Sequence, residues 1–327
     1  MTFQMTGVQS RPVTDRLFSF ECARLLAAIA VISIHIGGSR TMGALGETAR
    51  FAVPLFFGLS GYFFAYRRPF PLERRVMRLL QLYLFWVLAY AGLHLLIGRG
   101  PTDDLPIRLV FGGGHGFHLW FISGLCQVTI LFWLMRRWSW PAIFALSVLL
   151  FLLNLAFCVY GTAFGAGLDW NPRYGPFFGL VFFAYGAWIA DRGVVPRRPF
   201  AWLALTAGLA AANNLELVLM KWLGIPEGFD YGIPDVRLLT LPLGLAAITT
   251  VAAFKDHSPD WPVAREVIGR LATVSLGIYA CHILVLHLIR HDGGLDSEPV
   301  AVFAATVTGS TLLALALSAT PLRRFVT

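Results

Sequence analysis

Charged residues are scarce in this chain. Asp, Glu, Lys and Arg make up only 13% of its 327 residues, which is about half the fraction typical of soluble globular domains. Hydrophobic residues reach 57%, and a water-soluble fold cannot hide that much apolar surface. The composition therefore excludes an ordinary soluble protein and predicts an integral membrane protein.

Cysteine is also rare, and long polar loops are missing. The four cysteines fall in apolar runs at unrelated spacings, so the sequence predicts neither a disulfide framework nor a zinc site; they are Cys22, Cys126, Cys158 and Cys281. The longest loops, 98–117 and 255–270, are too short to build a hydrophobic core of their own. We therefore expect no appended soluble domain.

Long apolar runs are what the chain has in abundance. Most have about the 17–25 residues that a spanning helix needs; the runs are 17–38, 49–66, 79–97, 118–135, 141–160, 176–191, 200–223, 236–254, 271–290 and 299–320. We expect an all-α polytopic membrane protein with about ten transmembrane helices in one bundle. Its domains would be an N-terminal tail (1–16), a transmembrane domain (17–320) and a C-terminal tail (321–327).

Lys and Arg are distributed unevenly between the two sides of this bundle. With the N-terminus inside, cytoplasmic segments hold seventeen of the 26 basic residues and outer segments hold eight, as the positive-inside rule requires. We therefore expect a multi-pass protein of the inner or plasma membrane with both termini cytoplasmic. This orientation and anionic headgroups explain the net charge of +8, so nucleic acid is not an expected partner.

The first apolar run contains two ionisable residues, Arg24 and His35. A bilayer penalises such side chains by several kcal/mol, so they survive mostly where they face a protein interior and serve chemistry or transport. Their spacing of eleven positions puts both on one helix face, about 16 Å apart. Glu21 lies one turn before Arg24 and can pair with it. This polar stripe must point into the bundle.

Polar motifs recur later in the chain in a fixed order. Arg24 and His35, with ten residues between them, are followed by Phe56-Phe57-x-x-Ser60-Gly61-Tyr62, Arg75-x-x-Arg78, His118-Leu-Trp120 and Tyr279-x-x-His282. This ordered set, which spans about residues 16–290, resembles the acyltransferase-3 family of multi-pass membrane acyltransferases. The Val53-Pro-Leu-Phe-Phe and Asn171-Pro-Arg173 stretches resemble its branch that O-acetylates sugars of surface glycans and lipid-linked saccharides.

The resemblance implies an acyl-CoA-dependent O-acyltransferase. An acyl group, usually acetyl, would pass from cytoplasmic acyl-CoA to a hydroxyl of a glycan or lipid-linked saccharide at the outer face. Acyl-CoA is then a co-substrate, and no permanently bound cofactor or metal is expected. The family commonly has Asp-Gly before the helix 1 Arg and Gly after it, where this chain has Glu21, Cys22 and Leu25.

Residue chemistry assigns the catalytic roles, each with a structural alternative. The imidazole of His35 has the pKa of a general base for a sugar hydroxyl; alternatively it bridges two helices by hydrogen bonds. Arg24, next to Glu21, is suited to the anionic part of the donor or to the oxyanion. The alternative for Arg24 is an ion pair with Glu21 that only fixes helix packing.

The remaining candidates fall into two groups. Donor binding is assigned to Arg75, Arg78, Ser60 and Tyr83, and acceptor binding or lining of the site to His118, Trp120, Arg173, Tyr279 and His282. A positive-inside loop would also produce the arginines of the first group, and an interfacial aromatic belt would produce Trp120.

A membrane transporter of acylated saccharides is the rival interpretation, because a buried Arg/His/Glu relay also suits proton coupling. The lack of a detectable internal repeat argues against it.

Overall fold

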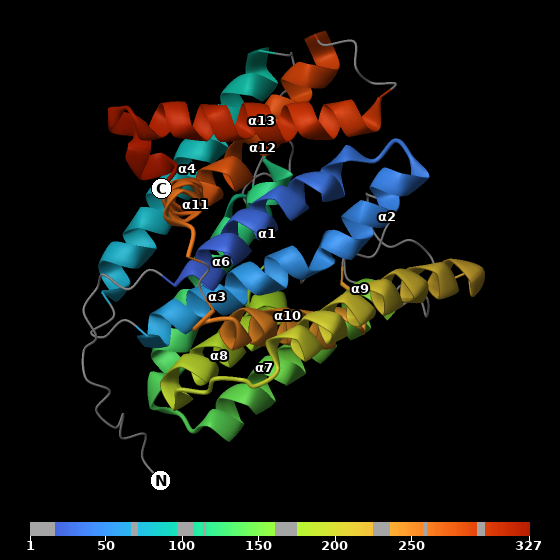
Figure 1. Cartoon of the computed structure of the whole chain (residues 1–327), viewed down its shortest axis with the longest axis vertical. Helices are drawn as coiled ribbons and strands as arrows, with labels where there is room; N and C mark the ends of the chain where they lie inside the picture. The colour runs from blue at the N-terminus through green and yellow to red at the C-terminus, as the bar shows by residue number, and fades with distance from the viewer. Residues whose placement is uncertain are drawn as a thin grey trace. The chain divides into compact units, whose positions relative to one another are not determined.

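The computed structural model describes residues 17–66, 71–96, 108–113, 116–160, 175–224, 236–257, 260–292 and 298–327. Within these residues the chain forms helices and no strands (Figure 1). The predicted all-α fold class is confirmed. The predicted tail at residues 1–16 lies outside the described part of the chain.

Each of the ten apolar runs contains an α-helix. The helices are α1 (Phe18–Ile36), α2 (Arg40–Thr48), α3 (Ala52–Tyr66), α4 (Leu72–Leu96), α6 (Trp120–Leu134), α7 (Trp140–Asn154), α8 (Pro176–Arg192), α9 (Pro199–Trp222), α10 (Thr240–Ala253), α11 (Pro262–Thr273), α12 (Ser275–Asp292) and α13 (Pro299–Ser318). Short 3-10 or π segments flank them: η1 (Ala49–Phe51), η2 (Arg108–Gly112), η3 (Phe117–Leu119), η4 (Met135–Arg137), η5 (Leu155–Tyr160) and η7 (Pro321–Phe325). Helices α2 and α11 occupy segments that the sequence predicted as loops.

Within the described part of the chain, six helical segments are long and apolar enough to cross a membrane. They are α1, α4, α9, α13, the continuous stretch Phe117–Arg137 around α6, and Trp140–Phe157 around α7. The pair α11 and α12 adds a seventh if it is one span bent by 62°. Helices α3, α8 and α10 have 15, 17 and 14 residues, so a count of ten spans is not confirmed, whereas a polytopic membrane protein is.

The outer faces of these helices are apolar. Leu88 on α4 is 69% exposed, Leu215 on α9 is 67% exposed and Leu312 on α13 is 61% exposed. Side chains of this kind would form a costly patch in water, whereas a lipid bilayer accepts them. Their exposure agrees with membrane-spanning helices.

The chain divides into two compact units. The first contains residues up to Phe20, Val53–Leu72 and Gln127–Ser258, and the second contains Glu21–Ala52, Glu73–Cys126 and Pro259–Thr327. In the first unit α7 packs along α8, and α9 packs along α10. In the second, the closest packing joins α12 to α13, which lie side by side in Figure 1.

Small residues let helices α3 and α8 of the first unit approach each other at backbone distance. A Cβ added to Gly61 would lie 1.9 Å from the carbonyl oxygen of Phe183, and one added to Gly186 would lie 1.9 Å from that of Gly58. Close helix contacts in membranes use small residues in this way. The glycine of the Phe-Phe-x-x-Ser-Gly-Tyr motif is therefore explained by helix packing.

The last residues of the chain pack into the second unit. The indole of Trp86 donates to the carbonyl oxygen of Phe325 at 2.9 Å, and the ring of Phe325 stacks on Phe85 with centroids 4.3 Å apart. The backbone N–H of Gly277 donates to the carbonyl oxygen of Val326 at 3.1 Å, and Val326 is fully buried. The segment that we predicted as a tail at 321–327 thus joins α4 to α12.

Candidate active site

Helix α1 presents its ionisable residues at a partly covered face. Ala27, Ala28 and Ile32 are fully buried, because small side chains on this helix permit close packing. Glu21, Arg24 and His35 are half-buried, as expected for a polar stripe that points towards protein rather than lipid. The predicted pairing of Arg24 with Glu21 and their predicted roles stay predictions.

His35 lies at the end of α1 against two aromatic rings of the second unit. Its centroid is 5.4 Å from that of Phe117 in η3, and the two planes are at 71°. The centroid of His282 in α12 lies 5.2 Å away with the planes at 34°. Residues from three distant parts of the chain therefore meet at this imidazole.

A second layer of rings lies behind His35. The imidazoles of His118 and His282 have centroids 4.8 Å apart, and Tyr279 lies 5.8 Å from each of them. His282 is completely buried, and His118 and Tyr279 are 1% exposed. Of the three imidazoles only His35 is half-buried, so it is the least covered ring of the three. We call His35, His118, Tyr279 and His282 the histidine cluster.

Backbone carbonyl groups define the proton positions on the two buried imidazoles. Nε2 of His118 lies 3.0 Å from the carbonyl oxygen of Ala280, and Nδ1 of His282 lies 2.5 Å from that of Tyr279. A carbonyl oxygen only accepts hydrogen bonds, so both of these nitrogens carry protons. In the neutral rings the opposite nitrogens, Nδ1 of His118 and Nε2 of His282, are then acceptors; both are buried and have no hydrogen-bond partner in the described chain.

Helix α4 supports the cluster through Tyr90. Its hydroxyl donates to the carbonyl oxygen of Ala280 at 2.9 Å and accepts from the N–H of Leu284 at 3.1 Å, while its ring lies 5.1 Å from His118. A Cβ on Gly116 would meet the Tyr90 ring at 2.7 Å. Glycine at this position thus lets η3 bring His118 onto Tyr90.

The end of α1 is anchored on several sides. The guanidinium of Arg290, near the end of α12, donates to the carbonyl oxygen of Ile36, and a cation is favourable at the C-terminus of a helix. The chain then turns through Gly37 and Gly38, whose φ values are +59° and +81°, a conformation that glycine adopts readily. A Cβ on Gly46 of α2 would lie 3.0 Å from the backbone of α1.

The donor-binding candidates of α4 lie towards its other end. Arg75 is half-buried, and Arg78 is exposed and donates from Nε to the carbonyl oxygen of Thr327 at 3.0 Å. Twelve residues separate Arg78 from Tyr90, which is about 18 Å along a helix. The hydroxyl of Tyr83 donates to the carbonyl oxygen of Leu109, so Tyr83 holds η2.

Ser60 and Trp120 were predicted site residues, and neither is one of the four residues of the cluster. Ser60 belongs to the first unit, where its hydroxyl donates to the carbonyl oxygen of Phe56 at 2.8 Å. Trp120 is half-buried at the first position of α6. Arg173 lies outside the described residues.

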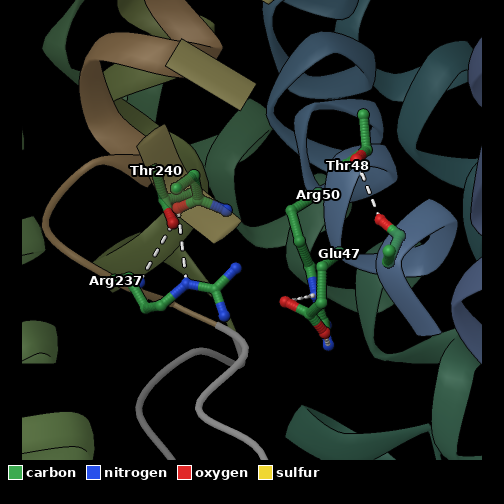
Figure 2. A network of polar contacts seen from close by, with 7 residues as sticks. Glu47, Thr48, Arg50, Arg237 and Thr240 are labelled. Carbon is green, nitrogen blue, oxygen red and sulfur yellow. Dashed lines mark hydrogen bonds and ion pairs between the residues drawn. The ribbon is translucent and has the colours of Figure 1, made fainter. Parts of the chain in front are cut away.

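Sequence reasoning missed several polar residues that the structure shows to be engaged. Tyr90 and Arg290 at the cluster are two of them. A buried ion pair at the start of the segment leading to α3 is another: the Arg50 guanidinium donates to the carboxylate of Glu47 at 2.7 and 3.3 Å (Figure 2). For Arg290 the sequence contained a signal, because a charged residue ends the apolar run 271–290.

The first unit contains its own polar network. Glu216 of α9 accepts hydrogen bonds from the hydroxyl of Tyr160 at 2.6 Å and from the N–H groups of Leu238 and Leu239, both at 2.9 Å. The carboxylate thereby satisfies free N–H groups at the start of α10. Arg237 is completely buried and donates from its backbone N–H to Thr240 at 3.0 Å (Figure 2). This network stabilises the junction of α9 and α10.

The fold and the histidine cluster define an all-α membrane protein in which a half-buried histidine lies next to a pair of buried imidazoles. The family comparison agrees with this fold. The family model described as "Acyltransferase domain" matches residues 17–319. The chain therefore belongs to the acyltransferase-3 family and is a membrane acyltransferase, and the resemblance predicted from the ordered motifs is confirmed. No curated protein and no solved structure matches the chain.

Proposed function

We propose that the protein transfers an acyl group, most simply acetyl, from cytoplasmic acyl-CoA to a hydroxyl of a carbohydrate or lipid-linked glycan at the outer face of the membrane. The observation that carries the proposal is the histidine cluster in a member of an acyltransferase family. The two sequence stretches that resemble the sugar O-acetylating branch support a glycan acceptor.

His35 is the general base of this proposal. It takes the proton of the acceptor hydroxyl while the oxygen attacks the thioester carbonyl of the donor. The carbonyl carbon then loses the CoA sulfur, and the proton on His35 passes to the thiolate, which leaves as free CoA. The products are the O-acylated sugar and CoA, and the base returns to its neutral form.

The layout of α4 supports a CoA donor. In acyl-CoA the thioester sits at the end of a long flexible arm, remote from the phosphates. Arg75 and Arg78 lie at one end of α4, and Tyr90, which contacts His118, lies about 18 Å further along it. Guanidinium groups bind phosphates well. Arg75 and Arg78 would hold the phosphates while the arm reaches towards His35.

Acyl transfer by the purified protein tests the proposal. Wild-type protein in detergent should release CoA from acetyl-CoA when a crude glycan acceptor is added, with no membrane gradient present. His35→Ala should lower this rate by about 10²–10⁴-fold, the usual contribution of a general base. His287→Ala, an exposed histidine on α12, is the matched control and should keep the wild-type rate.

The transporter alternative predicts the opposite pattern. It requires saccharide flux in sealed vesicles that depends on Arg24, together with no acetyl-CoA turnover by the purified protein. That result would replace the acyltransferase mechanism proposed for this site.

A further inference from the structure

One ring nitrogen of His282, Nε2, carries a lone pair whose position is defined by the hydrogen bond on the other side of the ring. Nδ1 of His282 donates to the carbonyl oxygen of Tyr279, one turn earlier on α12, at 2.5 Å. This leaves Nε2 as the acceptor of the neutral ring. Nε2 is fully buried without a hydrogen-bond partner among the described residues, and an unsatisfied buried acceptor costs about 1–3 kcal/mol.

The neighbouring ring can satisfy this acceptor. The His35 centroid lies 5.2 Å from that of His282, and the two planes are only 34° apart. A neutral imidazole carries one N–H, and an imidazolium carries two. Hydrogen bonds in catalytic sites are often long before substrate binds and tighten in the reacting complex.

We propose that His282 is the positioning residue for His35: its Nε2 accepts the N–H of one ring nitrogen of His35, so that the other ring nitrogen carries the lone pair that acts as base. The same contact stabilises His35 when it is protonated during the reaction. This inference rests on the proposed function, because a defined His35 tautomer matters only if His35 is the base. In this proposal the His of the Tyr-x-x-His motif acts by orienting His35 and does not contact the substrate itself.

The backbone carbonyl of Tyr279 prepares this role. It accepts the hydrogen bond from the Nδ1–H of His282, so the neutral ring carries no proton on Nε2 to present to His35. Arg290 holds the end of α1 through the carbonyl oxygen of Ile36, the residue after His35. Helix α12 therefore carries His282 and, through Arg290, also holds the end of α1 next to His35.

Two substitutions of His282 test separately its Nδ1 hydrogen bond to Tyr279, which we call the anchor, and its acceptor nitrogen Nε2. The amide of His282→Asn matches the position of Nδ1 and keeps the bond to Tyr279, but it has no group at the position of Nε2. The amide oxygen of His282→Gln reaches the position of Nε2 and can accept from His35, but it gives up the anchor. His287→Asn is the control, because His287 has the same kind of bond, to the carbonyl oxygen of Ile283 at 2.9 Å, and is exposed.

The kcat for acetyl transfer should decrease in the order wild type, His282→Gln, His282→Asn, with about a tenfold gap or more between the two variants, since orientation of a general base contributes one or more powers of ten. The KM for acetyl-CoA should change little, because His282 touches no substrate. His287→Asn should match wild type. Equal rates for His282→Asn and wild type, or a higher rate for Asn than for Gln, would overturn the inference.

A measurement without turnover separates this inference from the proposed function. In protein labelled with ¹⁵N-histidine, neutral His35, assigned by its loss in His35→Ala, should show one predominant tautomer in wild type and a mixture in His282→Asn. A mixture already in wild type would overturn the positioning role, even if acyl transfer depends on His35. A single tautomer without any acetyl-CoA turnover would retain the His282 contact and reject the acyltransferase mechanism.

Discussion

The roles proposed for His35 and Arg24 of α1 depend on different properties of their side chains. In the mechanism proposed for this site, His35 acts through one nitrogen lone pair, and its ring neighbours decide which nitrogen carries it. Arg24 would act through its planar guanidinium, which can bind phosphate or carbonyl oxygens with two parallel hydrogen bonds. A conservative change that keeps the charge therefore tests Arg24 more sharply than removal of the side chain.

Arg24→Lys should lower acetyl-CoA use about tenfold to a hundredfold, because charge-assisted hydrogen bonds contribute about 1.5–3 kcal/mol and Lys lacks the fork. Glu21→Gln should have a smaller effect, since it removes a neighbour of the arginine and not a donor contact. The kcat/KM values for acetyl-CoA measure both. A larger loss in Glu21→Gln than in Arg24→Lys would favour the structural ion pair as the main role of Arg24.

The residues of the histidine cluster were chosen from the sequence one by one, and their contacts were not. His35 was chosen as an ionisable residue inside an apolar run, whereas His118, Tyr279 and His282 were chosen from the motifs that resemble the family. Their spacing along the chain says nothing about which rings touch. Tyr90 was missed because a tyrosine in an apolar helix is ordinary until its hydroxyl is seen to bond two backbone groups of α12.

At the scale of helices, some glycines lie where two helices pack closely and others lie where no neighbouring atom is near. A Cβ added to Gly61 of α3 would lie 1.9 Å from the carbonyl oxygen of Phe183, whereas a Cβ added to Gly208 of α9 would have no atom within 4 Å. Both are helical, so the intrinsic preference for alanine is the same for both. Their substitution isolates the packing term.

Gly61→Ala should destabilise the protein by about 1–3 kcal/mol through overpacking against α8. Gly208→Ala should be neutral or stabilise it by up to about 1 kcal/mol, because alanine is the better helix former. Unfolding of the purified protein in mixed micelles, followed by circular dichroism, compares the two. Equal stability of both variants would contradict the close approach of α3 and α8.

The last residues of the chain contact both α4 and α12, and Gly277 of α12 leaves space for them. A Cβ on Gly277 would lie 2.6 Å from the Cβ of Val326. Gly277→Ala should therefore release this segment and speed tryptic cleavage after Arg323 and Arg324. Gly92→Ala on α4, where an added Cβ meets nothing within 4 Å, is the control. Unchanged cleavage in Gly277→Ala would show that the segment tolerates the displacement.

At the scale of the whole molecule, the sidedness of the membrane protein stays a prediction from charge. The excess of Lys and Arg puts the start of α4 inside and α2 outside. In a background without the native cysteines, Gly43→Cys on α2 should react with an impermeant maleimide added to intact cells. Arg74→Cys on α4 should react only after the membrane is opened. Both positions are exposed, so labelling reports the side of the membrane; the reverse pattern would invert the topology.

Composition and local pattern were sufficient for the all-α class, for the location of a helix in every apolar run, and for the family. These features depend on hydrophobicity and on polar residue types, which neighbouring positions along the chain define. Helices α2 and α11 were missed because short amphipathic helices look like loops when judged by mean hydropathy alone.

Tertiary structure alone decided how the site is put together. The rings of His35, His118 and His282 come from α1, η3 and α12, and the protons of the two buried imidazoles are directed by carbonyl oxygens of α12. The sequence by itself determined that histidines lie in apolar helices. Which nitrogen accepts and which donates depends on backbone groups brought near by packing, and no local pattern encodes that choice.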